Sequence, residues 1–249
     1  MSWHCLAHST TIATVAETAH VPVPDSVFTV QNARFLPQRN YGLLFAYMNG
    51  LLVNQCRISS PSIRQFSPAQ VRPIDLAALP VTRPGVADYR NNPLLLKALE
   101  EISVTSINSA ATSGVYHSLL GVSDGAMIPV PGGDIFTIRG TAATTLTVEQ
   151  WSLLAVTWAD TLPAGRYACV GLHAVSTGAV GARCIFEDQV LRPGSIGFAL
   201  ESAIPHPMFL KGGLGVWGYF TGNRMPNVEV LSISADTAET VYLEFIRVG

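Results

Sequence analysis

Charge is scarce in this sequence. Asp, Glu, Lys and Arg make up 13% of the 249 residues, against about 25% in an average soluble domain, while 48% are hydrophobic and the mean hydropathy is +0.32. Much of the protein surface must therefore be uncharged. In a soluble protein, a large uncharged surface usually lies against another subunit.

Cysteine motifs are also lacking. The four cysteines, Cys5, Cys56, Cys169 and Cys184, form no CxxC pair and no regular spacing, so no zinc site or disulfide framework is indicated. Three of them lie in apolar, strand-like runs and are predicted to be small buried hydrophobic residues in a reducing compartment. A single disulfide between Cys169 and Cys184 is left open by the sequence.

Targeting and membrane-spanning signals are missing as well. The N-terminus has no basic cluster followed by a continuous apolar stretch, which a signal peptide would need. The most apolar window, residues 41–53, is interrupted by Asn49-Gly50 and is shorter than the roughly 20 residues that cross a bilayer. We expect synthesis and assembly in the cytoplasm.

Motifs for catalysis are not found. The sequence contains no glycine-rich phosphate loop, nucleophile elbow or helical metalloprotease motif. Several residue pairs invite a catalytic or metal-binding interpretation, but a structural role is favoured for each, and a mobile terminus for the N-terminal histidines. The pairs are Glu187-Asp188, His173 with Ser176, His117 with Ser118, and His4 with His8. We predict no enzymatic activity, no metal and no cofactor.

The charges that are present are unevenly distributed. Residues 34–97 have a balance of +6, and residues 98–249 have a balance of −6. Opposite charges suit docking between copies of one chain or a basic face turned toward phosphate; solvated loops with unmatched arginines are an equal alternative. No sequence-specific nucleic-acid recognition is indicated. The candidate contact residues of this basic region are Arg34, Arg39, Arg57, Arg64, Arg72, Arg83 and Arg90.

The second half of the chain predicts a series of short strands separated by Gly, Pro and Asn turns, which is typical of a β-sandwich or barrel. Some of these runs, such as residues 153–156 and 167–172, are apolar on both faces. We expect both faces to be covered, by a second domain or a second subunit. The predicted strands are 135–139, 144–148, 152–158, 166–175, 182–186, 195–200, 215–220, 227–234 and 240–247.

The first half is less regular. Residues 1–25 end in Val21-Pro22-Val23-Pro24 and predict an extended arm that lies over a neighbour or is partly disordered. Residues 43–48 and 51–56 flank Asn49-Gly50, which favours a type I′ hairpin, with a helix as the minor alternative.

Six prolines between residues 60 and 93 predict a long irregular excursion. Asn92 as N-cap and Pro93 at the first helical position predict a helix over residues 93–101. Further strands are expected at 26–30, 102–107 and 115–122, with a domain boundary at 128/129.

The low charge, the N-terminal arm, the proline-rich excursion and the terminal strand series resemble the major capsid proteins of icosahedral viruses. A second β-rich segment before the terminal one resembles the double jelly-roll type of tailless, membrane-containing bacteriophages. Residues 214–220 and 226–231 are similar to the closing strands of such proteins. Residues 26–122 show only four or five clear strands, so a single C-terminal jelly roll with a large N-terminal elaboration is the alternative.

This resemblance implies an all-β fold of two jelly-roll sandwiches side by side, over residues 26–128 and 129–249. It implies a structural virion protein whose partners are other copies in a homotrimer and an icosahedral shell. Other expected partners are virion proteins such as a vertex protein, and an internal membrane or genome facing the basic region. The competing interpretation is a jelly-roll carbohydrate- or receptor-binding module. Its candidate loop contacts are Trp217, Tyr219 and Asn223.

Overall fold

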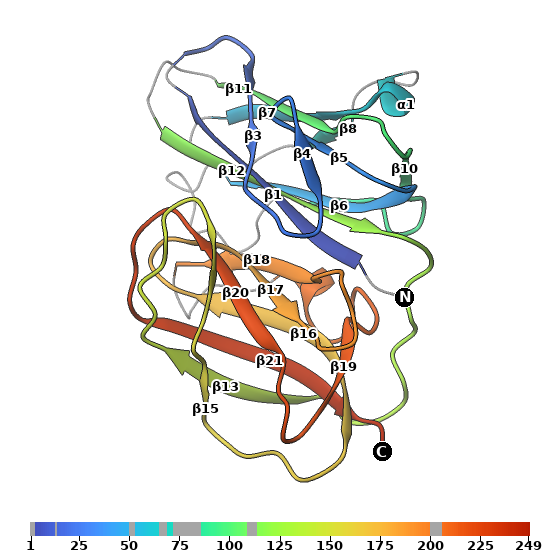
Figure 1. Ribbon diagram of the computed structural model, residues 1–249, viewed down its shortest axis with the longest axis vertical. Coiled ribbons are helices and arrows are strands. Elements are labelled where there is room, and N and C mark those ends of the chain that lie inside the picture. Colours follow the sequence, from blue (N-terminus) through green and yellow to red (C-terminus); the bar gives the residue numbers. More distant parts are fainter. Residues whose placement is uncertain are drawn as a thin grey trace. The chain divides into compact units, whose positions relative to one another are not determined.

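The protein forms two compact all-β units (Figure 1). The computed structural model describes residues 3–12, 14–49, 53–64, 69–71, 86–108, 114–199 and 206–249. The N-terminal unit comprises residues 6–125, and the C-terminal unit comprises residues 1–5 and 126–249. The chain passes from one unit to the other close to the Pro-rich and Gly-rich segment at which a boundary was expected.

The C-terminal unit is a two-layered β-sandwich. One layer has the order β15 (Thr157–Trp158), β13 (Phe136–Ala142), β21 (Glu239–Arg247), β16 (Arg166–Val175) and β19 (Gly218–Thr221). The other has the order β14 (Trp151–Leu153), β20 (Asn227–Ser232), β17 (Ala179–Ile185) and β18 (Gly194–Phe198). A short parallel pairing between β16 and β18 joins the two layers, and the 3-10 helix η1 spans Pro207–Phe209.

The N-terminal unit is also built from two layers. In one, β9 (Val86–Asp88) and β10 (Leu94–Leu96) pair with β6 (Tyr41–Asn49), followed by β12 (Gly114–Ser123), β1 (Trp3–Ile12) and β3 (Val21–Pro22). The other has the order β2 (Thr18–Ala19), β11 (Ser103–Asn108), β7 (Val53–Ser59) and β8 (Ala69–Val71). The hairpin of β4 (Thr29–Gln31) and β5 (Arg34–Leu36) and the short helix α1 (Pro61–Arg64) complete the described elements.

Both units have the same strand order. When the eight main strands of a unit are numbered along the chain, the layers are 1-8-3-6 and 2-7-4-5 in each unit. The eight strands of the C-terminal unit are β13, β14, β16, β17, β18, β19, β20 and β21; those of the N-terminal unit are β1, β2, β6, β7, β8, β9 with β10, β11 and β12. This order is a jelly roll, an eight-stranded sandwich with two Greek keys. The predicted all-β fold with two jelly rolls is confirmed, and the alternative of a single jelly roll is wrong.

The predicted helix over residues 93–101 is wrong. Leu94–Leu96 is the strand β10, which pairs with Tyr41–Leu43 of β6. Leu99 has a φ of 62°, a left-handed conformation through which an α-helix cannot continue. The helix preference of Asn92 and Pro93 stabilises this segment less than the hydrogen bonds that it gains by joining the sheet.

Both strands of the hairpin predicted around Asn49-Gly50 are present, but they do not pair with each other. The strand β6 pairs with β12, β9 and β10 in one layer, whereas β7 pairs with β11 and β8 in the other. The third and fourth strands of a jelly roll belong to different layers, so the topology overrides the turn preference of Asn-Gly. Gly50 itself lies outside the described residues.

The expected N-terminal arm is a strand over much of its length. Residues 3–12 form β1, which is buried from Trp3 to His8. Both faces of this stretch are covered, so its sequence lacks the alternation of apolar and polar residues that marks a half-exposed strand. The following residues contribute the short strands β2 and β3.

The strand β16 is buried on both faces, as its apolar sequence predicts. All residues from Tyr167 to Val175 are buried. On one face, side chains of β16 form a hydrophobic cluster with other segments of the same unit. This cluster contains Ala168, Val170, Val216 and Ile246, with Ile128, Val130 and Tyr219 packed against it. Cover by a second domain or a second subunit stays a prediction. Residues 153–156 differ, because Leu153 is 54% exposed.

Candidate interaction surfaces

The described arginines of the basic region are paired within the N-terminal unit. Four of the seven candidates have described side chains, and each forms an ion pair with a carboxylate. The pairs are Arg34–Glu101 at 2.7 Å, Arg39–Asp124 at 2.9 Å, Arg57–Glu17 at 3.3 Å and Arg90–Asp88 at 2.7 Å. Arg72, Arg83 and the side chain of Arg64 lie outside the described residues.

The fold also reduces the predicted charge asymmetry. Glu17, Glu101 and Asp124 lie outside the segment that counts as +6 but fold into the same unit. The N-terminal unit contains eight basic and seven acidic residues, and the C-terminal unit contains seven basic and ten acidic residues. The two units are therefore much closer to neutral than the two segments of sequence. A contact role for the arginines stays a prediction.

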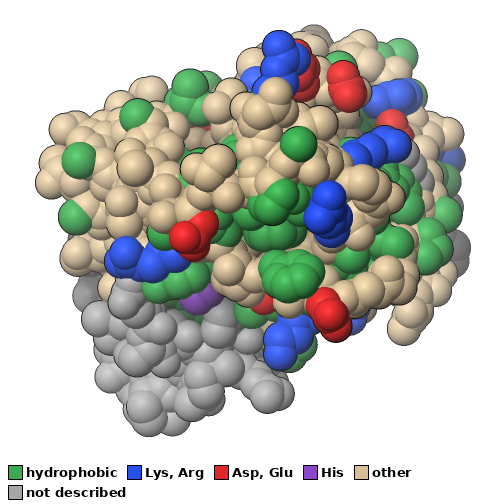
Figure 2. All heavy atoms as spheres, turned by 90° about the horizontal axis from the view of Figure 1, so that it is seen from below, with side chains coloured by type: hydrophobic (Ala, Val, Ile, Leu, Met, Phe, Trp, Pro, Cys, Tyr) green, Lys and Arg blue, Asp and Glu red, His purple; other side chains and the backbone are tan. Residues whose placement is uncertain are grey.

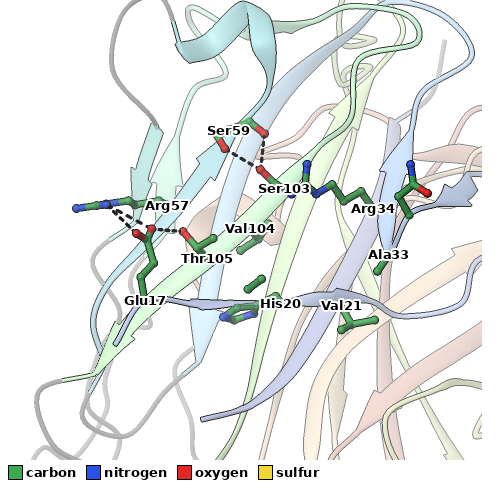
Figure 3. Close-up of a pocket in the computed structure, with 12 residues that line it drawn as sticks. Glu17, His20, Val21, Ala33, Arg34, Arg57, Ser59, Ser103, Val104 and Thr105 are labelled. Atoms are coloured by element: carbon green, nitrogen blue, oxygen red, sulfur yellow. Dashed lines mark hydrogen bonds and ion pairs between the residues drawn. The ribbon is translucent and has the colours of Figure 1, made fainter. Parts of the chain in front are cut away.

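A polar pocket of about 470 Å³ lies on the N-terminal unit (Figure 3). Arg57 and Glu17 line one side of it, and Arg34 lines the other. The Glu17 carboxylate accepts hydrogen bonds from Arg57 Nη1 at 3.3 Å and from Thr105 Oγ1 at 2.6 Å. The fold thus brings two of the seven candidate arginines to one site, together with a carboxylate that sequence reasoning did not place there.

The wall of this pocket next to Arg34 is a strained turn. Asn32 and Ala33 join β4 to β5 with φ angles of 50° and 55°, which are the left-handed angles of a type I′ turn. An alanine in this region costs roughly 1–2 kcal/mol. Ser59 and Ser103, which also line the pocket, share a hydrogen bond of 2.7 Å between their hydroxyls. The arrangement offers hydroxyl, carboxylate and guanidinium groups to a polar ligand.

The three candidate loop contacts do not form one surface. Trp217 is completely buried and packs edge-on against Trp3 with ring centroids 5.1 Å apart, so its predicted contact role is wrong. Tyr219 is partly buried, and the Arg166 guanidinium lies over its ring at 4.4 Å. Asn223 is exposed in the turn that follows β19. The contact roles of Tyr219 and Asn223 stay predictions.

The C-terminal unit contains a buried group of charges, here called the ion triad, made of Arg183, Glu229 and Arg192. Glu229 accepts hydrogen bonds from Arg183 Nε at 2.6 Å and from Arg192 Nη1 at 2.8 Å. Arg183 is 1% exposed, and its guanidinium lies over the Trp151 ring at 4.2 Å. The Glu229 carboxylate accepts charge-assisted hydrogen bonds from both arginines, which offsets part of the cost of taking these charges out of water. No local sequence signal marks the triad, because its members come from separate strands and loops.

The first residues of the chain attach to the ion triad. The backbone carbonyl of Cys5 accepts a hydrogen bond from Arg183 Nη1 at 3.3 Å. The backbone N–H of Cys5 donates to the Arg192 carbonyl, and the Arg192 N–H donates to His4 Nδ1, both at 2.9 Å. These bonds and the Trp3–Trp217 contact place residues 3–5 in the C-terminal unit.

The remaining residues that were considered for catalysis or metal binding have structural positions in the fold. His4 and His8 are buried and lie four residues apart on the strand β1, which separates them by roughly 13 Å. The mobile terminus that was favoured for them is therefore wrong. His117 and Ser118 are adjacent on β12 and are both buried; neighbours on a strand point to opposite faces. Glu187 forms an exposed ion pair with Arg224. Among the described residues, no group of three or more His, Cys, Asp or Glu side chains could hold a metal ion.

All four cysteines are buried free thiols. The Cys184 thiol shares a hydrogen bond with Cys169, and burial is the main cause that raises the pKa of Cys184. Burial likewise raises the pKa of Cys56 to about 12. The cysteines therefore act as small hydrophobic residues, and the disulfide left open by the sequence is not formed.

The face shown in Figure 2 has hydrophobic side chains gathered near its middle. Charged side chains of both signs lie around them, and some of these lie beside one another. Large apolar residues with at least half of their surface exposed occur in both units. They are Val15, Val21, Leu99, Phe136, Leu153 and Val190.

The described part of the chain contains no helix that is long and apolar enough to cross a membrane. No family model matches the sequence, and no curated protein sequence matches it. Among solved structures, the chain is similar to the major capsid protein P2 from bacteriophage PM2, with a TM-score of 0.27 and 10% sequence identity over 99% of this chain and 98% of that chain.

Proposed function

We propose that this protein is a structural virion protein, a major capsid subunit. The observation that supports this role is the tandem of two jelly rolls with one strand order. Jelly rolls recur in viral capsid walls and in lectins, and the link from this fold to a capsid is an analogy between architectures. The proposed role is structural and includes no catalysis.

Two similar sandwiches in each chain also suggest how copies assemble. Three chains would supply six similar sandwiches, and these would form a homotrimeric ring with pseudo-sixfold symmetry. Such trimers would tile an icosahedral shell, after synthesis in the cytoplasm of the host. The hydrophobic side chains that gather near the middle of the face in Figure 2 are suited to contacts between copies, because covering them removes apolar surface from water.

Light scattering coupled to size-exclusion chromatography tests this assembly. We expect a mass near three times the 26.6 kDa of one chain, and electron micrographs that show six-sided particles or shells as the concentration rises. A protein that stays monomeric at every concentration would contradict the capsid role. A stable dimer would contradict the proposed homotrimer. It would still be compatible with a structural role, which electron micrographs of the assembled particles would then test.

A second candidate function is recognition of a polar ligand such as a carbohydrate, and the pocket of Figure 3 favours it. A glycan array with the purified protein tests this function. Binding should weaken at least tenfold in Glu17→Gln, which keeps the size of the side chain but removes the charge that holds Arg57. An array without hits would exclude carbohydrate as the ligand.

A further inference from the structure

Residues 95–99 form an exposed and partly apolar segment at the edge of the N-terminal unit. The strand β10 is the last strand of its layer, and among the described strands it pairs only with β6. Leu95 is 49% exposed and Leu99 is 67% exposed. Lys97 between them is exposed as well, whereas Leu96 is buried. An edge strand that exposes apolar side chains is a site at which another chain can attach.

The backbone is strained where it presents Leu99 to water. The φ of Leu99 is 62°, in the left-handed region where a bulky side chain is an outlier and glycine is the usual residue. Two hydrogen bonds hold this conformation. The Leu99 N–H donates to the Pro37 carbonyl at 2.8 Å, and the Ala98 N–H donates to Asn40 Oδ1 at 2.9 Å. Strain that the surrounding structure maintains in this way is concentrated at functional sites.

The positive charge at the centre of this segment is uncompensated. The side chain of Lys97 forms no ion pair or hydrogen bond with the described residues. Glu100 accepts hydrogen bonds from the N–H and the hydroxyl of Ser62, both at 2.9 Å. Glu101 pairs with Arg34. An ammonium group between two exposed leucines is suited to a partner surface that combines apolar side chains with one carboxylate.

The C-terminal unit has a pocket with this combination of groups. It has a volume of about 490 Å³ and lies between the end of β17 and the turn that joins β19 to β20. This volume is in the range of pockets that bind small ligands or side chains. The apolar residues that line it include Phe186, Phe220, Met225 and Pro226.

Two exposed carboxylates also line this pocket, and they differ in their partners. Glu187 is already paired with Arg224, which lines the pocket too. The Asp188 side chain forms no ion pair or hydrogen bond with the described residues. The pocket therefore has one uncompensated negative charge, which is opposite in sign to the charge of Lys97.

We propose that residues 95–99 of one copy dock into this pocket of a second copy, with the Leu99 side chain against the apolar lining and the Lys97 ammonium on the Asp188 carboxylate. This contact rests on the proposed function, since it requires that copies of the chain associate. It is head-to-tail, because the N-terminal unit of one copy meets the C-terminal unit of the next. Contacts of this type form closed rings, such as a homotrimer, when the rotation between copies closes.

Charge reversal in the full chain tests the contact. In Lys97→Glu and in Asp188→Lys, like charges would meet, so the concentration at which half of the protein is assembled should rise roughly tenfold or more. Light scattering coupled to size-exclusion chromatography measures this concentration. The double variant exchanges the two charges, and it should return to within about threefold of the wild type.

The matched control for charge reversal is Asp160→Lys, because Asp160 is another exposed aspartate of the C-terminal unit. It should leave assembly unchanged. Single variants that assemble like the wild type, or a double variant without rescue, would overturn the contact.

Leu99→Gly separates a contact role from a structural role. Glycine adopts the positive φ without strain, so the melting temperature should not fall. The half-assembly concentration should nevertheless rise roughly tenfold or more, because the apolar contact is lost. Val15→Gly is the control, since Val15 is 56% exposed, and it should leave assembly unchanged. A Leu99→Gly protein that is folded and assembles like the wild type would overturn the contact.

A zero-length cross-link identifies the contact even when assembly is weak. A carbodiimide activates the Asp188 carboxylate, and the Lys97 amine then forms an amide bond with it, while the carbodiimide takes up the water that is lost. In a mixture of isotope-labelled and unlabelled protein, mass spectrometry should find this cross-link between a labelled and an unlabelled peptide. Asp188→Asn should abolish it, and Asp160→Asn should retain it.

The outcomes distinguish this contact from the capsid role. If the wild type assembles but the cross-link is absent and the variants have no effect, the contact is wrong and the capsid role stands. If the wild type is monomeric at every concentration and no cross-link forms, both are wrong.

Discussion

In the N-terminal unit the buried polar side chains include the three imidazoles of His8, His20 and His117, whereas in the C-terminal unit they include two arginines that share the carboxylate of Glu229. Both interiors are enclosed by eight strands in the same order. In the first unit, burial lowers the pKa of all three imidazoles, so the neutral rings are favoured. In the second, the charged groups are hydrogen-bonded to one another, and the shared carboxylate offsets part of the cost of burying the arginines. One topology can therefore enclose different kinds of polar group, because strand order depends on where apolar residues lie and not on which polar groups they enclose.

The largest expected effect concerns the ion triad of the C-terminal unit. Glu229→Gln removes the anion that Arg183 and Arg192 share, and it leaves Arg183 buried without compensation. We expect a loss of about 3–5 kcal/mol in the free energy of unfolding of this unit. All four tryptophans belong to the C-terminal unit, so tryptophan fluorescence in a denaturant titration follows its unfolding selectively.

The matched control for that variant is Glu187→Gln, because Glu187 pairs with Arg224 at the surface and its side chain is 66% exposed. An exposed ion pair of this kind contributes little to the free energy of unfolding, so the denaturation midpoint should hardly change. Equal midpoints for the two variants would show that burial of the triad has no energetic consequence, and would remove the contrast between the two interiors.

The next effect concerns the attachment of residues 3–5. Trp3→Ala removes a ring that is 2% exposed and packs against Trp217, so we expect a loss of about 3 kcal/mol. The loss should appear in the fluorescence transition of the C-terminal unit, although Trp3 stands at the opposite end of the sequence. Val15→Ala is the control, because Val15 is 56% exposed. A fluorescence transition unchanged by Trp3→Ala would mean that these residues do not stabilise that unit.

The smallest expected effect is a gain in the stability of the N-terminal unit. Ala33→Gly relieves the positive φ of Ala33 beside the polar pocket, and we expect stability to rise by up to about 1 kcal/mol. Ala19→Gly is the control at an exposed strand position without a positive φ, where glycine should cost about 0.5–1 kcal/mol. Thermal unfolding followed by circular dichroism measures both. A loss of stability in Ala33→Gly would indicate that the turn is not strained.

The two units also differ in how well the sequence predicts them. The strand at residues 166–175 is predicted at its observed bounds, because a continuous apolar run ends at Gly and Pro turns on both sides. In the N-terminal unit, the sixth strand of the jelly roll is divided into β9 and β10, and β1 is buried on both faces from Trp3 to His8. Neither has the short-range pattern that marks a strand, so the second jelly roll becomes evident only from the pairing.

The candidate residues show the same limit. Arg34 and Arg57 stand out in the sequence because positive charge is concentrated around them, but their partners Glu101 and Glu17 are 67 and 40 residues away. The pairing depends on how β2, β5, β7 and β11 lie next to one another, which no local pattern specifies.

The strand β1 begins among residues of one unit and continues into the other, and this has a consequence for synthesis on the ribosome. Residues 3–5 leave the ribosome well before Arg183, Arg192 and Trp217, which they contact in the folded unit. In a chain that has not yet been extended to residue 217, the ring of Trp3 is therefore exposed to water. Residues 3–5 can take their final place only after these later residues have been translated.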